Sequence, residues 1–386
     1  MSDLSLQLQQ AHSQLPVTSY FDEALFQREL ETIFQQGPRY VGHQLAVPNV
    51  GDYYALPHEG EGRALVRSAN GVELVSNVCR HRQAVMLKGR GSLNNQAPGS
   101  AGGNIVCPLH RWTYDLNGQL LGAPHFQQQP CSHLKSYDLQ NWRGLLFNSA
   151  QNIQQQLAQV PFLEEFDFSG YLLDSVKVHT VDYNWKTFIE VYLEDYHVEP
   201  FHPGLGQFVE CANLQWHYGE NWSVQSVGLN AGLRRPGTPV YKRWHEAVTR
   251  FSNGVEPKHG AIWFAMYPNL MVEWYPHVLV VASLHPQGPQ KTLIATEYYY
   301  PEEITLFERE FVQAEQAAYD ETAVEDDEIA LRMDHGRKIL MERGEDDAGP
   351  YQTPMEDGMV HFHKWYANAM KKGHQLNTAV VSKKII

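Results

Sequence analysis

The sequence predicts an α+β protein in which a small all-β domain precedes a larger domain of helices and strands. Between residues 40 and 150, short apolar runs alternate with glycine, asparagine and proline turns, as in all-β domains. After about residue 160, strand-like runs and long helical patterns share one region. Hydrophobic residues make up 43% of the 386 residues, so the chain can bury a substantial core.

Each element is predicted from its local pattern. Residues 20–37 carry apolar side chains at helical intervals and end at Gly37-Pro38, which predicts a helix. Strand-like runs follow at 64–66, 72–75, 278–283 and 293–300. A long helical pattern covers 302–343. We therefore expect three parts: a helical segment 1–39 that packs on the larger domain, a β domain 40–155 and the larger domain 156–386.

Two segments are predicted to contribute little to either core. Met1–Gln14 is polar and rich in glutamine, so we expect a solvated tail without the basic and apolar stretches of a signal peptide. Residues 91–104 hold glycine, serine and asparagine with almost no large apolar side chain, which predicts a flexible loop.

Charge and cysteine content exclude several classes of protein. The net charge of −14 offers no broad basic surface for nucleic acid or an anionic membrane. The sequence contains no run of about 18 apolar residues, so it predicts no membrane span. Four cysteines are too few for a disulfide framework in a chain of this length, and Cys131 and Cys211 read as ordinary thiols. We therefore expect a soluble cytoplasmic protein.

The other two cysteines belong to a metal-binding pattern in the β domain. Cys79-x-His81 is followed, after 25 residues, by Cys107-x-x-His110. Two thiolates and two imidazoles suit either tetrahedral zinc or a Rieske [2Fe–2S] cluster, in which histidines replace two cysteines on one iron. Zinc fingers group like ligands together, whereas each segment here supplies one of each kind. This alternation favours the [2Fe–2S] cluster, because each segment must reach both irons, and it leaves zinc or coincidence as alternatives.

A second pattern lies at the end of a predicted helix. Residues 184–196 repeat apolar side chains every three to four positions, and Pro200 is expected to stop the helix. The break would let His202 fold back towards His197. Two imidazoles and one carboxylate form the facial triad of non-haem Fe(II) oxygenases, with positions left open for O2. The alternative is a pair of structural histidines near a helix end.

With these motifs, the chain resembles the Rieske non-haem iron oxygenases over nearly its whole length. The resemblance rests on NVCRHR, CPLHRWTYDLNGQLLGAP and the segment NWKTFIEVYLEDYHVEPFHP. It implies a Rieske domain, then a helix-plus-antiparallel-sheet catalytic domain with a mononuclear iron on His197, His202 and an aspartate. Glu325-Asp326, followed by Gly336, matches the spacing of choline monooxygenase-like members. Asp326 is therefore the expected third ligand, and Asp327 is the alternative; both could instead lie on a solvated acidic helix face.

The chain departs from the family pattern at several positions. Gln83 and Arg111 stand where members carry glycine, Leu109 stands where they carry tyrosine, and 91–104 forms an insertion between the cluster motifs. Glu194 replaces the usual aspartate that joins a cluster histidine of one subunit to an iron histidine of its neighbour in a ring of three. The resemblance thus implies a homotrimer with an electron path over His110, Glu194 and His197. With glutamate at this position, the chain is similar to family members that act on carnitine and glycine betaine.

The resemblance implies the terminal oxygenase of a multicomponent system. Electrons from NADH would arrive through a separate flavin and iron–sulfur reductase or a ferredoxin, since the chain has no Gly-x-Gly-x-x-Gly nucleotide fingerprint. O2 and a small organic substrate, aromatic or a quaternary amine, would then react by hydroxylation or oxidative demethylation. The alternative is a Rieske electron carrier that makes no use of His197, His202 or Asp326.

Overall fold

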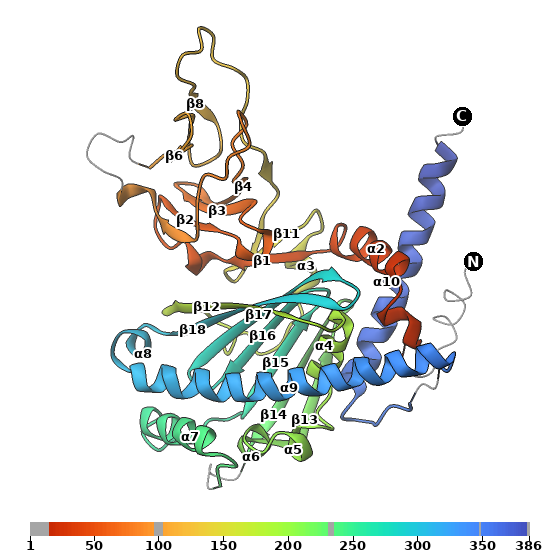
Figure 1. The fold of residues 1–386 in the computed structure, drawn as a ribbon. Coiled ribbons are helices and arrows are strands. Elements are labelled where there is room, and N and C mark those ends of the chain that lie inside the picture. The colour runs from red at the N-terminus through yellow and green to blue at the C-terminus, as the bar shows by residue number, and fades with distance from the viewer. Residues whose placement is uncertain (1–14, 96–102, 231–234, 347–348, 384–386) are drawn as a thin grey trace. The chain divides into compact units, whose positions relative to one another are not determined.

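The computed structural model describes residues 15–95, 103–230, 235–346 and 349–383 (Figure 1). The expected tail Met1–Gln14 lies outside the described residues, as does 96–102 of the expected flexible loop. The chain divides into two compact units, Pro38–Gln154 and the combination of Met1–Gly37 with Gln155–Ile386. Each unit has its own core.

The Pro38–Gln154 unit consists of small antiparallel sheets. Five strands pair in the order β5-β2-β3-β4-β9, and two three-stranded sheets have the orders β1-β11-β10 and β6-β7-β8. Their bounds are β1 Arg39–His43, β2 Asp52–Ala55, β3 Arg63–Ser68, β4 Gly71–Ser76, β5 Arg90–Ser92, β6 Ile105–Val106, β7 Thr113–Tyr114, β8 Leu120–Gly122, β9 Ser136–Tyr137, β10 Gln140–Trp142 and β11 Leu145–Asn148. Cys79 and Cys107 belong to the core of this unit, together with Trp112 and Tyr114.

A seven-stranded antiparallel sheet forms the centre of the larger unit, with strand order β12-β18-β17-β16-β15-β14-β13. Its strands are rich in β-branched and aromatic residues, which suit a sheet buried on both faces. The bounds are β12 Tyr171–Val181, β13 Val209–Tyr218, β14 Trp222–Leu229, β15 Ala261–Met266, β16 Leu270–Tyr275, β17 Val278–Gly288 and β18 Lys291–Pro301.

Helices cover one face of this sheet. Because side chains alternate along a strand, Val278, Val280, Ala282 and Leu284 of β17 share a face, and all four belong to cores that also contain helix residues. Figure 1 shows α9 as the long helix that runs crosswise to the strands. The helices are η1 Val17–Tyr20, α2 Glu23–Glu29, η2 Leu30–Phe34, α3 Ile153–Gln156, α4 Trp185–Tyr192, α5 Val198–Phe201, α6 Leu205–Phe208, α7 Pro239–Phe251, α8 Glu302–Phe307, α9 Arg309–Arg343 and α10 Asp357–Lys383.

The α+β fold class is confirmed, but some local predictions are wrong. Residues 91–95 are not part of a flexible loop, because they form the end of β5 and a short helix, and Leu93 is buried in the core. The sequence predicted a helix that continues to Pro200, but α4 ends at Tyr192 and Pro200 lies inside the next short helix, α5. A proline is tolerated in a first helical turn, where its missing N–H has no intrahelical partner. Among the described residues, no helix is both long and apolar enough to cross a membrane.

Candidate metal centres

The first centre consists of two buried cysteines and two neighbouring histidines of the β domain. Cys79 and Cys107 are buried, with 1% and 2% of their surface exposed, and Cys79 Sγ lies 3.5 Å from the Tyr114 hydroxyl. The rings of His81 and His110 are 4.7 Å apart. His81 Nδ1 is buried without a hydrogen-bond partner among the described residues. A buried nitrogen with no partner is costly, and a metal would satisfy it, so these residues fit the cluster that the sequence predicts.

Two turns of the same type present the two pairs of ligands. The N–H of Gln83 donates to the carbonyl of Cys79 at 3.1 Å, and the N–H of Arg111 donates to the carbonyl of Cys107 at 3.1 Å. Gln83 and Arg111 both adopt positive φ values, 55° and 60°. This is left-handed backbone, which glycine adopts without the steric cost that other residues incur. The two positions where the sequence departs from family glycines are therefore positions of backbone strain.

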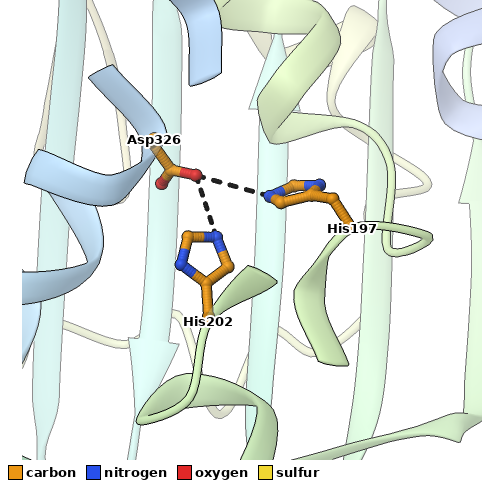
Figure 2. Close-up of side chains that lie close together, drawn as sticks. All are labelled: His197, His202 and Asp326. Carbon is orange, nitrogen blue, oxygen red and sulfur yellow. Dashed lines mark ion pairs between the residues drawn. The ribbon is translucent and has the colours of Figure 1, made fainter. Parts of the chain in front are cut away.

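The second centre lies in the larger unit, where segments distant in sequence meet. Figure 2 shows His197, His202 and Asp326 converging, with Asp326 on α9 and the histidines on either side of α5. Asp326 Oδ1 lies 3.4 Å from His197 Nε2 and 3.0 Å from His202 Nε2. Ligands about 2.1 Å from one metal and at right angles would lie roughly 3 Å apart. The three atoms therefore have the spacing that a single metal ion requires.

A carboxylate is hydrogen-bonded to the other ring nitrogen of each histidine. Glu194 Oε1 lies 2.6 Å from His197 Nδ1, and Glu325 Oε2 lies 2.7 Å from His202 Nδ1. This contact fixes Nδ1 as the protonated nitrogen and turns Nε2 towards Asp326, as in metal-bound histidines. The sequence indicated Glu194 from its family position. It did not indicate the role of Glu325, whose neighbour Asp326 was the only signal.

Asp327 points away from this cluster. Its Oδ1 accepts a hydrogen bond from the Tyr183 hydroxyl at 2.6 Å, and its Oδ2 lies 3.9 Å from His179 Nε2. Consecutive helix residues are rotated by about 100°, so the side chains of two adjacent aspartates point in different directions. Of the two alternatives left open by the sequence, Asp326 is the one that lies with both histidines.

The second centre has an electrostatic surrounding that favours a cation. Burial alone would lower the pKa of His197, but Asp326 and Glu194 outweigh it and raise this pKa to about 10. The pKa of His202 is also raised against the effect of burial, by Asp326 and Glu325. The negative potential that holds protons on these rings would equally attract a divalent metal, which displaces them.

Buried polar contacts hold the helix that precedes the histidines. Lys186 Nζ on α4 lies 2.6 Å from Glu29 Oε1, and Arg337 Nη2 of α9 lies 2.6 Å from Glu190 Oε2. His363 Nε2 of α10 approaches the other oxygen of Glu190 at 2.9 Å. The amphipathic pattern located the apolar side of α4 but gave no sign of these partners, because they come from both ends of the chain.

A cavity of about 140 Å³ opens beside the second centre. A cavity of comparable size, about 150 Å³, holds a ligand such as benzene. His197, His202 and Asp326 line it, and aromatic side chains and buried carboxylates are among the other residues that do so. It is therefore a candidate substrate site for a small molecule.

Known proteins share this combination of domains. Residues 168–372 match the family described as Ring hydroxylating alpha subunit (catalytic domain), and residues 37–138 match the Rieske [2Fe-2S] domain. A putrescine 2-hydroxylase of Ralstonia nicotianae is 63% identical over 372 residues, covering 96% of this chain and 100% of that protein. A putrescine 2-hydroxylase of Bordetella bronchiseptica is 57% identical over 366 residues, covering 93% of this chain and 85% of that protein.

Solved structures agree on the fold. A quaternary ammonium Rieske monooxygenase, CntA, matches with a TM-score of 0.72 at 21% identity, covering 95% of this chain and 98% of that chain. The catalytic-domain match favours the oxygenase over the electron carrier, since a carrier has no need of that domain. The chain therefore belongs to the Rieske non-haem iron oxygenases, as an alpha subunit with a Rieske [2Fe–2S] domain and a catalytic domain of the kind that binds mononuclear iron.

Proposed function

We propose that this chain is the terminal oxygenase of a system that hydroxylates putrescine, butane-1,4-diamine, at its second carbon. The observation that carries the proposal is the 63% identity to a putrescine 2-hydroxylase along the full length of that protein. The reaction consumes O2 and two electrons from NADH. One oxygen atom enters a C–H bond of the diamine, and the other leaves as water.

The cavity supports a ligand of this size and charge. Its volume of about 140 Å³ suits a molecule of about six non-hydrogen atoms, which is the size of putrescine. Two deeply buried carboxylates, Glu273 and Glu315, line it, and a diamine brings positive charge to such groups. The sequence alone favoured an aromatic or quaternary-amine substrate. A primary diamine shares with the latter its attraction to aromatic rings.

In this proposal the two histidines and one aspartate hold the mononuclear iron. His197 and His202 bind it through Nε2, and Asp326 binds it through its carboxylate. The 3.0 and 3.4 Å distances and the carboxylates on both Nδ1 atoms support this assignment. The iron, when bound, supplies the O2 chemistry of the reaction. The protein keeps the imidazoles oriented and leaves the cavity side of the centre open for substrate.

Cys79, His81, Cys107 and His110 would hold the [2Fe–2S] cluster, and His110 would lie on the path by which electrons leave it. We propose that the catalytic chain is a homotrimer in which His110 of one subunit meets Glu194 of the next. The hydrogen bond from His197 Nδ1 to Glu194 supports the inner half of this path. Mixing a cluster-deficient Cys79→Ala chain with an iron-deficient His197→Ala chain, followed by refolding together, should restore activity that neither has alone.

A separate NADH-dependent flavin and iron–sulfur reductase, or a ferredoxin, is the proposed electron donor. We name the exposed cations around the cluster motifs the cationic rim, which comprises Arg80, Arg82, Lys88, Arg90 and Arg111. None of these forms an ion pair within the described part of the chain. We also propose a cytoplasmic location. The four cysteines of this chain are free, and two of them must remain reduced thiolates to bind the cluster.

The test is substrate-stimulated O2 uptake by the reconstituted oxygenase with a surrogate reductase. Putrescine, glycine betaine, carnitine and an aromatic hydrocarbon are supplied separately, and products are identified by mass spectrometry. We expect tight coupling of O2 uptake to product only with putrescine, and a product heavier by one oxygen atom. Coupled turnover of a quaternary amine in preference to putrescine would contradict the proposal.

A further inference from the structure

One carboxylate in the cavity has a position that the iron centre does not explain. Glu273 lies in β16, on the sheet face that the helices cover, and only 5% of its surface is exposed. It lines the same cavity as His197, His202 and Asp326. Its charge is close enough to that of Asp326 for the two to affect each other. Glu273 therefore faces the space in which a substrate would react.

Two tyrosines hold this carboxylate in place. The Tyr275 hydroxyl donates to Oε2 at 2.8 Å, and the Tyr319 hydroxyl donates to Oε1 at 3.0 Å. Trp263 Nε1 in turn donates to the Tyr275 hydroxyl at 2.9 Å. Each carboxylate oxygen accepts two hydrogen bonds or more, so both retain capacity for another donor. The carboxylate is oriented but not saturated.

No cation within the described residues forms an ion pair with Glu273. Burial, opposed by the two tyrosine hydrogen bonds and reinforced by the charge of Asp326, raises its pKa to about 7. A buried carboxylate without a counter-charge is destabilising, so natural proteins pair it or keep it for function. A cationic ligand in the cavity would provide the missing charge.

Other cavity groups lack partners as well. The Tyr192 hydroxyl and Gln225 Oε1 are buried, and neither has a hydrogen-bond partner in the described residues. Both line the cavity. Burial raises the pKa of Tyr192, and the charge of Glu273 raises it further. A primary ammonium carries three N–H donors and no acceptor. It matches these oxygen acceptors, whereas a quaternary ammonium has no N–H to donate and would leave them unpaired.

Aromatic rings surround the same region. Trp244 and Tyr275 lie with ring centroids 5.6 Å apart, and Trp263 and Tyr275 with centroids 6.3 Å apart. All three line the cavity. Ring faces attract a cation and accommodate the methylene chain of an aliphatic amine. Around Glu273 the wall thus combines a carboxylate with aromatic surface, which suits a linear aliphatic ammonium.

We propose that Glu273 is a specificity-determining residue whose carboxylate binds a primary ammonium group of the substrate, with Tyr275 and Tyr319 as positioning residues. This inference rests on the proposed function and deepens it. It assigns one end of the diamine to β16, on a different element from the iron ligands. Hydrogen bonding then selects primary over quaternary ammonium groups, and the cavity excludes larger amines by size.

The test compares two buried glutamates with the same local structure. Glu297 in β18 is also 5% exposed, and Tyr299, two residues on, donates to it at 2.7 Å. Its side chain lies on the opposite sheet face and does not line the cavity, because Thr296 and Tyr298 take the cavity side. Glu297→Gln is therefore the matched control for Glu273→Gln.

Binding of putrescine and of the neutral isostere butane-1,4-diol is measured by calorimetry on the full chain with both iron centres. We expect Glu273→Gln to weaken putrescine binding by about 10- to 100-fold, the range of a hydrogen bond to a charged group. Diol binding should not change, and Glu297→Gln should bind both ligands as the wild type does. In turnover, KM for putrescine should rise more than kcat falls. Unchanged putrescine affinity in Glu273→Gln would overturn the inference.

A second variant covers failure of Glu273→Gln to fold. Tyr319→Phe removes one hydroxyl from the carboxylate and should weaken putrescine binding several-fold without changing diol binding. Equal loss for both ligands would mean that the wall is merely structural and would overturn the inference. A wild-type enzyme that neither binds nor hydroxylates putrescine overturns the proposed function itself. Wild-type hydroxylation with undisturbed binding in Glu273→Gln overturns only the assignment of Glu273.

Discussion

Each histidine of the second centre has different carboxylates at its two ring nitrogens. Asp326 faces both Nε2 atoms, while Glu194 and Glu325 each accept from one Nδ1. The two outer carboxylates look equivalent in geometry. They differ in surroundings, because Glu194 lies two residues beyond the end of α4 whereas Glu325 is part of α9. This difference allows the tasks of orienting a ligand and carrying electrons to be separated by mutation.

Asp326 and Asp327 provide a matched pair for the metal assignment. Asp326→Ala should lose the mononuclear iron, because it removes the carboxylate that faces both histidines. Asp327→Ala should retain it, since that carboxylate bonds instead to Tyr183. Iron and acid-labile sulfide analysis checks both. We expect one iron fewer per chain in Asp326→Ala and an intact cluster absorbance. Iron loss in Asp327→Ala with retention in Asp326→Ala would reverse the assignment.

Glu194→Gln and Glu325→Gln distinguish the electron path from ligand orientation. Both should weaken iron affinity by about 10- to 100-fold, as loss of a carboxylate behind a metal-bound histidine does. At saturating iron, only Glu194→Gln should slow oxidation of a pre-reduced cluster in a single turnover. An amide stabilises an adjacent imidazolium less well than a carboxylate does. Equal rates in the two variants would remove Glu194 from the path.

At the scale of elements, α4 depends on partners from three other segments. Its start is defined locally, since the Asn184 side chain caps it by accepting from the N–H of Lys186. Its position is set by Glu29, by Arg337 of α9 and by His363 of α10. Eight residues are too few for an isolated stable helix, so these contacts and the apolar packing decide its stability.

Glu190 should make folding stability depend on acid pH. Burial alone would raise its pKa, but Arg337, His363 and Tyr20 outweigh burial and hold it at about 2, against 4.5 for the ordinary group. A lowered folded-state pKa stabilises the protein above pH 4.5, and this contribution is lost as pH falls towards 2. The difference corresponds to about 3 kcal/mol.

Urea unfolding of wild type and Glu190→Gln between pH 7 and pH 3 checks this. The gap in free energy of unfolding should be about 3 kcal/mol or more at pH 7, since a buried charge partner is lost, and should narrow at pH 3. Glu328→Gln is the control, because Glu328 pairs with Arg332 on the exposed side of α9 and should change stability by less than about 0.5 kcal/mol. A gap independent of pH would contradict the assigned role of Glu190.

At the scale of the whole molecule, charge is distributed unevenly. The chain carries −14 overall, yet the cationic rim gathers five exposed positive side chains around the cluster motifs. Opposite charge on a partner steers encounter and raises the association rate. The rim therefore suits a reductase or ferredoxin with an acidic face near its own redox centre.

Salt should slow the partner-driven reduction of the cluster. Exposed charges are screened beyond about 10 Å at 0.1 M salt, so stopped-flow reduction by the partner should slow as salt rises. Arg82→Glu should slow it several-fold at low salt, while reduction by dithionite and the cluster spectrum stay unchanged. Lys338→Glu, an exposed cation on α9, makes the same charge change elsewhere and should have no effect. Insensitivity to salt and to Arg82→Glu would remove the rim from docking.

The sequence by itself determined the α+β class and the strands at 64–66, 72–75, 278–283 and 293–300. Periodicity carries this information, because burial of one face imposes a local repeat. Two short ligand motifs and the spacing Glu325-Asp326 were equally local, so Cys79, His81, Cys107 and His110 could be proposed without coordinates. The end of α4 could not be predicted, because a proline marks where a helix is unlikely to continue and not where packing ends it.

Only the tertiary structure decided which side chains meet across long stretches of chain. The choice between Asp326 and Asp327 depends on the rotation of α9 against α5, which packing sets and no local pattern encodes. The contacts of Glu325 with His202 and of Glu190 with Arg337 join residues more than 100 positions apart. Glu273 belongs to a strand whose sequence pattern gives no sign of a ligand site. The cavity that its carboxylate lines forms only where the sheet and its covering helices meet. Chemistry-bearing residues can be read from sequence, but their partners depend on the packing of distant elements.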